Sequence, residues 1–224
     1  MHDILIEEGV LAKNDGIAGE NREMLRGRGI YSINMVSSPG SGKTSIIEKT
    51  AGLLDGLLRL AVIEGDIETD LDAERIRRHG VPAKQITTGR ACHLDAHHVH
   101  HALPWLFEQD GIRLLIIENV GNMVCPAEYD LGEEMKVAVM SVAEGDDKPL
   151  KYPALFSASQ ALIINKTDLL PYTDFNMHRA RENALRINPE LKVFETSCTK
   201  GTGLQEWCGF LLSSAGAAAK APVK

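Results

Sequence analysis

The run Ser37-Ser38-Pro39-Gly40-Ser41-Gly42-Lys43-Thr44 is the strongest structural signal in the sequence. It follows an apolar run at 30–36 and precedes a helix-forming run that continues to Leu58. Strand, glycine-rich loop and helix in this order are typical of the phosphate-binding loop G-x-x-x-x-G-K-[ST], from which the run departs only by Ser37 in place of the first glycine. An ordinary strand–turn–helix corner is the alternative, and the complete P-G-S-G-K-T run argues against it.

The residue types in this loop suit the phosphates of a nucleotide. Glycines let backbone N–H groups approach the phosphates, and the N-terminus of the following helix adds its positive end. Lys43 is expected to reach the β- and γ-phosphates, and the Thr44 hydroxyl to ligate Mg²⁺. The residues predicted to bind nucleotide in this loop are Ser38, Pro39, Gly40, Ser41, Gly42, Lys43, Thr44 and Ser45.

Outside this loop, short apolar runs alternate with helix-forming runs. Strands are expected at 30–36, 60–64, 84–88, 114–118, 136–142, 161–165 and 192–196. Helices are expected after the loop, at 71–79, at 93–109 despite Pro104, at 175–187 and from 204 onward. The alternation predicts an α/β fold, a mostly parallel sheet with helices on both faces, of the P-loop NTPase type.

Length and composition favour one compact domain with short extensions. The chain has 224 residues, of which 44% are hydrophobic and 25% charged. We expect an N-terminal helix or arm at 1–28, a P-loop domain at 29–212 and a tail at 213–224. The net charge of −7 argues against nucleic acid as the main partner. No apolar run approaches the ~18 residues of a membrane span, and the first thirty residues lack a secretory h-region, so no membrane partner and a cytoplasmic location are expected.

A second run selects the base. Asn165-Lys166-Thr167-Asp168 directly follows an apolar strand, and a carboxylate there can accept both N1–H and N2–H of guanine, which adenine cannot match. Near the end of the next strand, Ser197 and Cys198 begin a run that resembles the loop contacting guanine O6 in GTPases. These residues predict GTP rather than ATP, and they argue against a P-loop small-molecule kinase.

Carboxylates end two of the predicted inner strands. Asp66 and Glu118 stand where ligands bind in an open α/β sheet, and with Lys43 they are the predicted catalytic residues. They can hold Mg²⁺ directly or through water, or orient the attacking water. Asp70 and Asp72 are nearby candidates, for which helix capping is an equal alternative. Gly121 can present its N–H to the γ-phosphate.

Five of the eight histidines fall between positions 93 and 101, directly after Cys92. At ~100° per residue, His93, His97 and His100 share one helical stripe and His101 flanks it. We interpret this group as a metal site, with a solvated polar face or a pH-sensitive patch as alternatives.

Cys125 lies seven residues after Glu118, on a loop that would respond to the nucleotide. Sulfur and imidazole donors suit Zn²⁺ or Ni²⁺. Cys92, His93 and Cys125 make three ligands, and the fourth can be water, His97 or a residue of a second subunit. Cys208 is expected to be a small buried side chain.

Four runs together resemble the HypB family, the GTPases of nickel insertion into nickel–iron hydrogenase. They are Ser37–Thr44, Cys92-His93-Leu94, Glu118-Asn119-Val120-Gly121-Asn122 and Cys125-Pro126-Ala127-Glu128-Tyr129-Asp130-Leu131-Gly132. The resemblance extends over about residues 29–212, and it implies a SIMIBI-class fold with slow, Mg²⁺-dependent GTP hydrolysis. It also implies partners: GTP and GDP, a second copy of the chain when GTP is bound, a companion nickel chaperone and the hydrogenase large subunit.

The resemblance further implies a metal site at the dimer interface. Its ligands would be Cys92, His93 and Cys125, joined in some members by His97 and His101. Lys151 matches a basic residue that senses the nucleotide across this interface. The pair Leu169-Leu170 can support the dimer or the core. Residues 1–29 carry no cysteine motif or histidine-rich stretch, so nickel storage is not expected.

The leading hypothesis is therefore a GTP-driven metallochaperone. A urease-type nickel GTPase is disfavoured, because its metal motif is Cys-Pro-His where this chain has Cys92-His93. A metal-sensing interaction module with a structural nucleotide is the alternative from another class.

Overall fold

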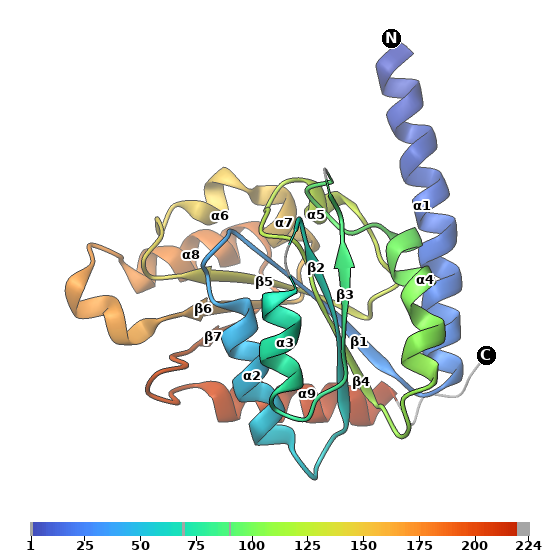
Figure 1. Cartoon of the computed structure of the whole chain (residues 1–224). Helices are drawn as coiled ribbons and strands as arrows, with labels where there is room; N and C mark the ends of the chain where they lie inside the picture. Colours follow the sequence, from blue (N-terminus) through green and yellow to red (C-terminus); the bar gives the residue numbers. More distant parts are fainter. Residues whose placement is uncertain (1, 69, 90, 219–224) are drawn as a thin grey trace.

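A seven-stranded sheet forms the centre of the molecule, in a computed structural model that describes residues 2–68, 70–89 and 91–218 (Figure 1). The strand order is β3-β2-β4-β1-β5-β6-β7, and every neighbouring pair is parallel. The strands are β1 (Tyr31–Ser37), β2 (Leu60–Asp66), β3 (Ala83–Thr87), β4 (Leu114–Glu118), β5 (Met135–Ser141), β6 (Ala161–Asn165) and β7 (Lys192–Glu195).

Helices cover both faces of the sheet, as parallel strands require. They are α1 (His2–Gly27), α2 (Lys43–Leu54), α3 (Leu71–Arg77), α4 (Ala96–Phe107), α5 (Cys125–Glu128), α6 (Lys148–Lys151), α7 (Pro153–Ala158), α8 (Met177–Ile187), α9 (Leu204–Ala218) and the 3-10 helix η1 (Thr167–Tyr172). One face packs against α2, α3 and α9 in a single large core. The other face has two separate cores, one under α1 and α4 and one under α5, α7 and α8.

A buried polar seam separates those two cores. Side chains alternate along β1, so Ile33 and Met35 enter the large core, whereas Ser32 and Asn34 face the opposite side. Both polar side chains are fully buried at the centre of the sheet. Buried polar groups require hydrogen-bond partners, and the partners here come from the loops that carry the candidate site.

The predicted strands are confirmed to within two residues at each end. The short helices α5, α6, α7 and η1 were not predicted, because four to six residues carry too little periodicity to recognise. Helix α9 runs to Ala218, so the first part of the predicted tail at 213–224 is helical. Residues 219–224 of that tail lie outside the described residues.

The expected N-terminal arm is a helix of 26 residues, α1. Its second half packs on the body through Ala18, Asn21 and Leu25, all at most 1% exposed. Its first half extends beyond the rest of the molecule (Figure 1). None of the helices in the described part of the chain combines the length and apolar content needed to cross a membrane.

Candidate nucleotide site and thiol–histidine cluster

The phosphate-binding loop joins β1 to the N-terminus of α2. Gly40 and Gly42 have φ values of 76° and 99°, which glycine adopts without strain. A Cβ on Gly42 would lie 2.5 Å from Asn165 Nδ2, so the loop and the guanine motif touch. Ser37 has a use that a glycine could not serve, because its Oγ accepts a 2.8 Å hydrogen bond from Lys43 Nζ.

A cleft of about 510 Å³ opens beside this loop at the carboxyl ends of β2 and β4. Five residues that the sequence analysis singled out line it together: Lys43, Thr44, Asp66, Glu118 and Gly121. Thr44 Oγ1 donates a 2.8 Å hydrogen bond to Glu118 Oε1.

Glu64 is a buried carboxyl that sequence analysis missed. It pairs in register with Glu118 on β4 and with Gln85 on β3. Burial, and next the charge of Glu118, raise the pKa of Glu64 to about 8. Burial likewise raises the pKa of Glu118 to about 7, against the lowering effect of Lys43. The same burial lowers the pKa of Lys43.

These carboxyls fit a bound divalent cation. Within the described residues, Oε2 of Glu64 and of Glu118 are buried without a hydrogen-bond partner. Carboxylate oxygens of Glu64, Asp66 and Asp72 lie within 4.8 Å of one another. Hard oxygen ligands facing a phosphate loop are the donors that Mg²⁺ prefers. The sequence analysis left Asp70 and Asp72 undecided between metal binding and helix capping, and Asp72 belongs to this carboxylate group.

Asp70 has a different role from Asp72. It stands at the N-cap of α3 without a side-chain capping bond, and its carboxylate pairs with Arg77 at 2.9 Å. This contact places Asp70 in a surface ion pair, whereas Asp72 lines the cleft.

The guanine motif is held against both neighbouring loops. Asn165 Nδ2 donates to the Ser41 carbonyl at 3.0 Å, and Lys166, with φ 62°, reaches the Gly40 carbonyl through its Nζ at 2.6 Å. The Ser197 hydroxyl donates to Asp168 Oδ1, while the Ser197 N–H donates to Thr202. Ser197 therefore positions the Asp168 carboxylate.

Cys198 also contacts the guanine motif. Its Sγ lies 3.7 Å from Asn165 Oδ1, and burial raises the pKa of this thiol. Cys208 is buried in the large core, as predicted.

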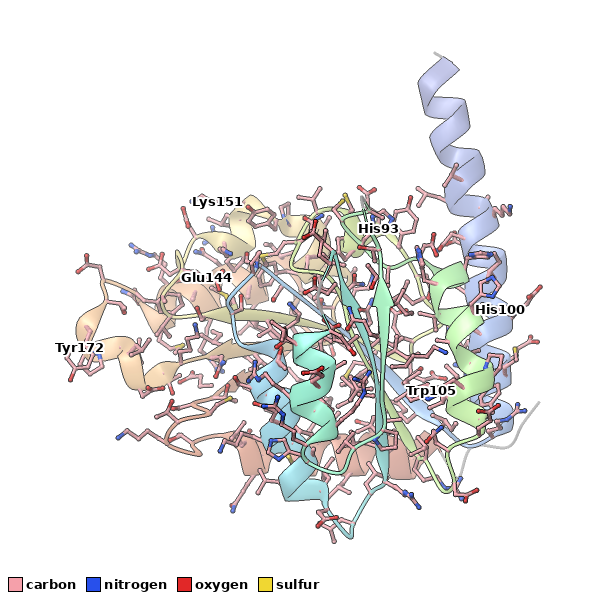
Figure 2. The ribbon with its side chains drawn as sticks, viewed as in Figure 1. His93, His100, Trp105, Glu144, Lys151 and Tyr172 are labelled. Carbon is pink, nitrogen blue, oxygen red and sulfur yellow. The ribbon has the colours of Figure 1, made fainter. Side chains whose placement is uncertain are left out.

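The ion pair of Glu144 and Lys148 is a second feature that the sequence analysis did not identify. The Lys148 ammonium contacts both Glu144 and the Ser38 hydroxyl, and Glu144 Oε1 accepts from Ser41 Oγ at 2.7 Å. The segment between β5 and α6 is thus in contact with the phosphate loop. Lys151, one turn further along α6, is exposed on the same upper edge as His93 and pairs with Asp147 at 2.7 Å (Figure 2).

Cys92, His93 and Cys125 form a cluster although 33 residues separate the two cysteines. The two sulfur atoms are 3.3 Å apart, and Cys92 Sγ lies 3.8 Å from His93 Nδ1. The neighbouring Cys92 thiol, and then burial, raise the pKa of Cys125. Burial lowers the pKa of His93, whose ring lies on Tyr129 with a centroid distance of 4.1 Å. Thiol and imidazole donors within 4.8 Å of one another suit a borderline or soft metal ion.

The predicted helical stripe of histidines is wrong, because α4 begins only at Ala96 and leaves His93 in the preceding loop. Asp95 caps the helix by accepting from the His98 N–H at 2.9 Å, and His98 lowers the pKa of Asp95 to about 2. His100 Nδ1 lies 2.8 Å from Asn21 Oδ1 on α1. The remaining two, His97 and His101, contact each other with their Nε2 atoms 3.0 Å apart.

The polar seam of the sheet connects the site loops. Asn119 Oδ1 accepts from the Leu94 N–H at 3.0 Å, and Asn119 Nδ2 donates to Asn34 Oδ1 at 3.2 Å. Asn34 in turn donates to Glu133 Oε1 at 3.2 Å. The segment after Cys92 and the loop after Glu118 are therefore tied to one buried asparagine.

Lys136 ties down the other cysteine loop. Its buried ammonium donates to the carbonyls of Pro126, Ala127 and Tyr129 at 3.1, 3.0 and 3.0 Å. Gly121, at the start of this loop, lies against the phosphate loop, since a Cβ there would be 2.9 Å from Pro39 Cγ. Phosphate loop and cysteine loop are thus in direct contact.

Comparisons with known proteins agree with this arrangement. The family model described as the CobW/HypB/UreG nucleotide-binding domain matches residues 32–195. The sequence is 53% identical over 206 residues to the hydrogenase maturation factor HypB of Azotobacter vinelandii, across 92% of this chain and 68% of that protein.

Two solved structures are similar over nearly the whole chain. The crystal structure of HypB from Helicobacter pylori in complex with nickel has a TM-score of 0.88 at 40% identity, covering 93% of this chain and 98% of that one. The crystal structure of the hydrogenase maturation factor HypB from Archaeoglobus fulgidus has a TM-score of 0.85 at 39% identity, covering 92% of this chain and 100% of that one.

Proposed function

Because the chain belongs to the HypB hydrogenase maturation factors of the CobW/HypB/UreG family, we propose that it is a GTP-hydrolysing metallochaperone that assists nickel insertion into nickel–iron hydrogenase. One observation carries the proposal: the loop from Glu118 to Cys125 touches both sites. Gly121 lies against Pro39 of the phosphate loop, and Cys125 Sγ lies 3.3 Å from Cys92 Sγ. Binding or loss of the γ-phosphate at one end of this loop therefore shifts the position of the cysteine at its other end.

The nucleotide in this proposal is GTP. Asp168 accepts the two guanine N–H groups, and the Ser197 hydroxyl holds its carboxylate in place. Lys43 exchanges its contact with Ser37 for the β- and γ-phosphates, and the loop from Ser38 to Ser45 binds them through backbone N–H groups.

Hydrolysis uses the carboxyls at the strand ends. Thr44, Asp66 and Glu118 hold Mg²⁺ directly or through water, and the buried Oε2 atom of Glu118 supports this assignment. When bound there, Mg²⁺ would supply positive charge against the charge that develops on the phosphates. Lys43 does the same at the γ-phosphate, and Gly121 offers its N–H there. Slow turnover suits a switch.

The cargo ion is Ni²⁺, with Zn²⁺ as the alternative occupant. Cys92, His93 and Cys125 supply three ligands from one chain, so four-coordination needs a further donor. In the proposal, two GTP-bound chains meet and complete the site across their interface. Lys151 then reaches the partner's nucleotide, and a companion nickel chaperone and the hydrogenase large subunit are the donor and the acceptor of the ion.

Exposed apolar side chains support this dimer. Val124 beside Cys125, Leu150 beside Lys151, and Leu169 after the guanine motif are 57, 51 and 36% exposed. Leu170, by contrast, packs on the core of the second face. We keep the division into an arm at 1–28, a GTPase domain from 29 and a tail after 212 as part of the same proposal.

Nickel titration with and without a non-hydrolysable GTP analogue tests the proposal. Binding of the GTP analogue is expected to change the affinity of the chain for nickel. Nickel must then change the affinity for the analogue by the same factor. Cys92→Ser should abolish the effect, whereas His178→Ala, on exposed α8, should leave it unchanged. Equal nickel affinity with and without the analogue would rule out the coupling, and a nucleotide that survives for days in single-turnover assays would favour the structural-nucleotide alternative.

A further inference from the structure

We propose that Lys148 is a further residue of the nucleotide site: its ammonium binds the γ-phosphate of GTP and so helps the site to distinguish GTP from GDP. This role of Lys148 rests on the proposed function, because GTP is the nucleotide there. It differs from the role of Lys151 on the same helix, which is proposed to reach the nucleotide of a partner chain. Lys148 acts on the phosphates bound by its own chain.

Lys148 begins α6, yet its side chain reaches the phosphate loop. Its Nζ atom contacts the Ser38 hydroxyl and pairs with the Glu144 carboxylate. The Lys148 side chain is 14% exposed, so its charge lies mostly out of water beside the second residue of the loop. Pro39, the next residue of the loop, lines the nucleotide cleft. A positive charge is therefore held next to the loop that is proposed to bind the phosphates.

Glu144 holds a negative charge at the same loop (Figure 2). Its Oε1 atom accepts a hydrogen bond from Ser41 Oγ at 2.7 Å. Burial would raise the pKa of Glu144, but the hydrogen bonds from Lys148 and Ser41 lower it, and it lies below its ordinary value. Burial lowers the pKa of Lys43, and Glu144 is among the carboxylates that oppose this effect, so its charge acts on the lysine expected at the β- and γ-phosphates. An ionised carboxylate here repels phosphate unless a cation lies beside it.

The Lys148 ammonium can donate more hydrogen bonds than its oxygen contacts use. An ammonium has three N–H donors, and within the described part of the chain Lys148 contacts two oxygen acceptors, on Ser38 and Glu144. Its other contact is Met123 Sδ at 3.6 Å, and a thioether is a weak acceptor. A phosphate oxygen is a much stronger acceptor for an ammonium, and it can also compete with Glu144. The flexible lysine stem lets the charge turn toward the γ-phosphate while α6 keeps its place.

Two possible roles of Lys148 can be separated by removing Glu144 as well. If Lys148 binds the γ-phosphate, its loss weakens GTP binding whether or not Glu144 is present. If Lys148 only neutralises Glu144, its loss has no effect once the carboxylate is gone. A double-mutant cycle of these two residues therefore tests the role directly.

The quantity to measure is the ratio of the dissociation constant for GDP to that for a non-hydrolysable GTP analogue. Competition against a fluorescent guanine nucleotide, with Mg²⁺, gives both constants for the full chain. Lys148→Met should lower the ratio about tenfold or more, because a charge-assisted hydrogen bond to the γ-phosphate is lost. Glu144→Gln/Lys148→Met should lie below Glu144→Gln by a similar factor. Lys192→Met, at an exposed position of β7, should keep the wild-type ratio.

Two results would overturn this role. One is the wild-type ratio in Lys148→Met, which is also the result expected if the substitution merely disturbs the phosphate loop and weakens both nucleotides alike. The other is an equal ratio in Glu144→Gln and Glu144→Gln/Lys148→Met, which would limit Lys148 to neutralising Glu144. In both cases GTP binding by the wild type, and with it the proposed function, would stand. A wild-type chain that binds neither nucleotide would contradict the proposed function and the role of Lys148 together.

Discussion

At the scale of single residues, Asp168 is the side chain that selects guanine in the proposed function. Its carboxylate is half-buried and held by the Ser197 hydroxyl, so the pair of oxygens is presented in one orientation. This contact comes from a loop beyond the next strand, and it is the part of the candidate guanine site that spacing alone did not reveal.

Asp168→Asn is predicted to change the base preference. It loses charge-assisted hydrogen bonds to guanine, so GTP affinity should fall about 10- to 100-fold. Xanthosine triphosphate should bind the variant better than the wild type, because the new amide N–H₂ can donate to the C2 carbonyl of xanthine. Fluorescent-nucleotide competition measures both, with the exposed Asp174→Asn as control. Undiminished GTP affinity of Asp168→Asn would show that Asp168 does not bind guanine.

Glu64 predicts a pH dependence of stability. Its pKa is about 8 in the folded protein against an ordinary 4.5, so between these values the folded chain keeps a proton that the unfolded chain has released. The free energy of unfolding must therefore fall as pH rises, at up to about 1.4 kcal/mol per pH unit.

Glu64→Gln isolates this contribution, because Glu118 adds a dependence of the same sign in both proteins. Between pH 5 and pH 7, the variant should gain about 2 kcal/mol relative to the wild type in urea unfolding without nucleotide or metal. Parallel pH profiles of the two proteins would show that Glu64 is ionised in the fold.

At the scale of elements, the polar seam explains why the cysteine loops have defined positions. Both loops bury apolar side chains, among them Leu94 and Met123, and both are also tied to buried polar groups. Asn119 holds the segment after Cys92, and Lys136 holds the carbonyls of α5. A loop held by a few hydrogen bonds can change its position when those bonds change, which apolar packing does not permit as readily.

Asn119→Ala is predicted to loosen both loops together. It leaves the N–H groups of Leu94 and Val120 without their partner, and the free energy of unfolding should fall by about 3 kcal/mol. Hydrogen exchange at these two amides should accelerate, and the effect of the GTP analogue on nickel affinity should shrink. Asn183→Ala, a half-buried asparagine on α8, is the matched control. Coupling that is unchanged in Asn119→Ala would show that the seam is structural only.

At the scale of the whole molecule, the two candidate sites open at the same edge. The carboxyl ends of parallel strands meet there, so the loops after β1, β2, β4 and β6 gather the phosphate, carboxyl, cysteine and guanine residues. The exposed apolar side chains Val124, Leu150 and Leu169 lie after β4, β5 and β6, beyond the same ends of the strands. In the proposed dimer, one surface therefore joins nucleotide and metal ion.

Leu169→Asp is predicted to weaken that dimer. A charge at a 36%-exposed leucine should cost little in the monomer but oppose burial between two chains. Light scattering with the GTP analogue should find dimers of the wild type and predominantly monomers of the variant. Leu57→Asp, at a 67%-exposed position near the amino ends of the strands, should dimerise normally. Equal dimerisation of Leu169→Asp would place the interface elsewhere.

The sequence by itself determined the parallel α/β fold, the phosphate loop and the guanine motif. Each of these depends on contiguous residues, whose spacing along the chain already reflects strand, turn and helix geometry. Sequence analysis could name Cys92, His93 and Cys125 as candidate metal ligands from their sulfur and nitrogen donors. It could not predict the distances between them.

Only the tertiary structure decided what distant residues do to one another. Strand register placed Glu64 beside Glu118 and raised its pKa, and the start of α4 at Ala96 separated His93 from the histidine pair. The 33-residue gap between Cys92 and Cys125 closes to a 3.3 Å sulfur contact because two loops leave the sheet at the same edge. Such contacts follow from strand order and register, which no local pattern along the chain encodes.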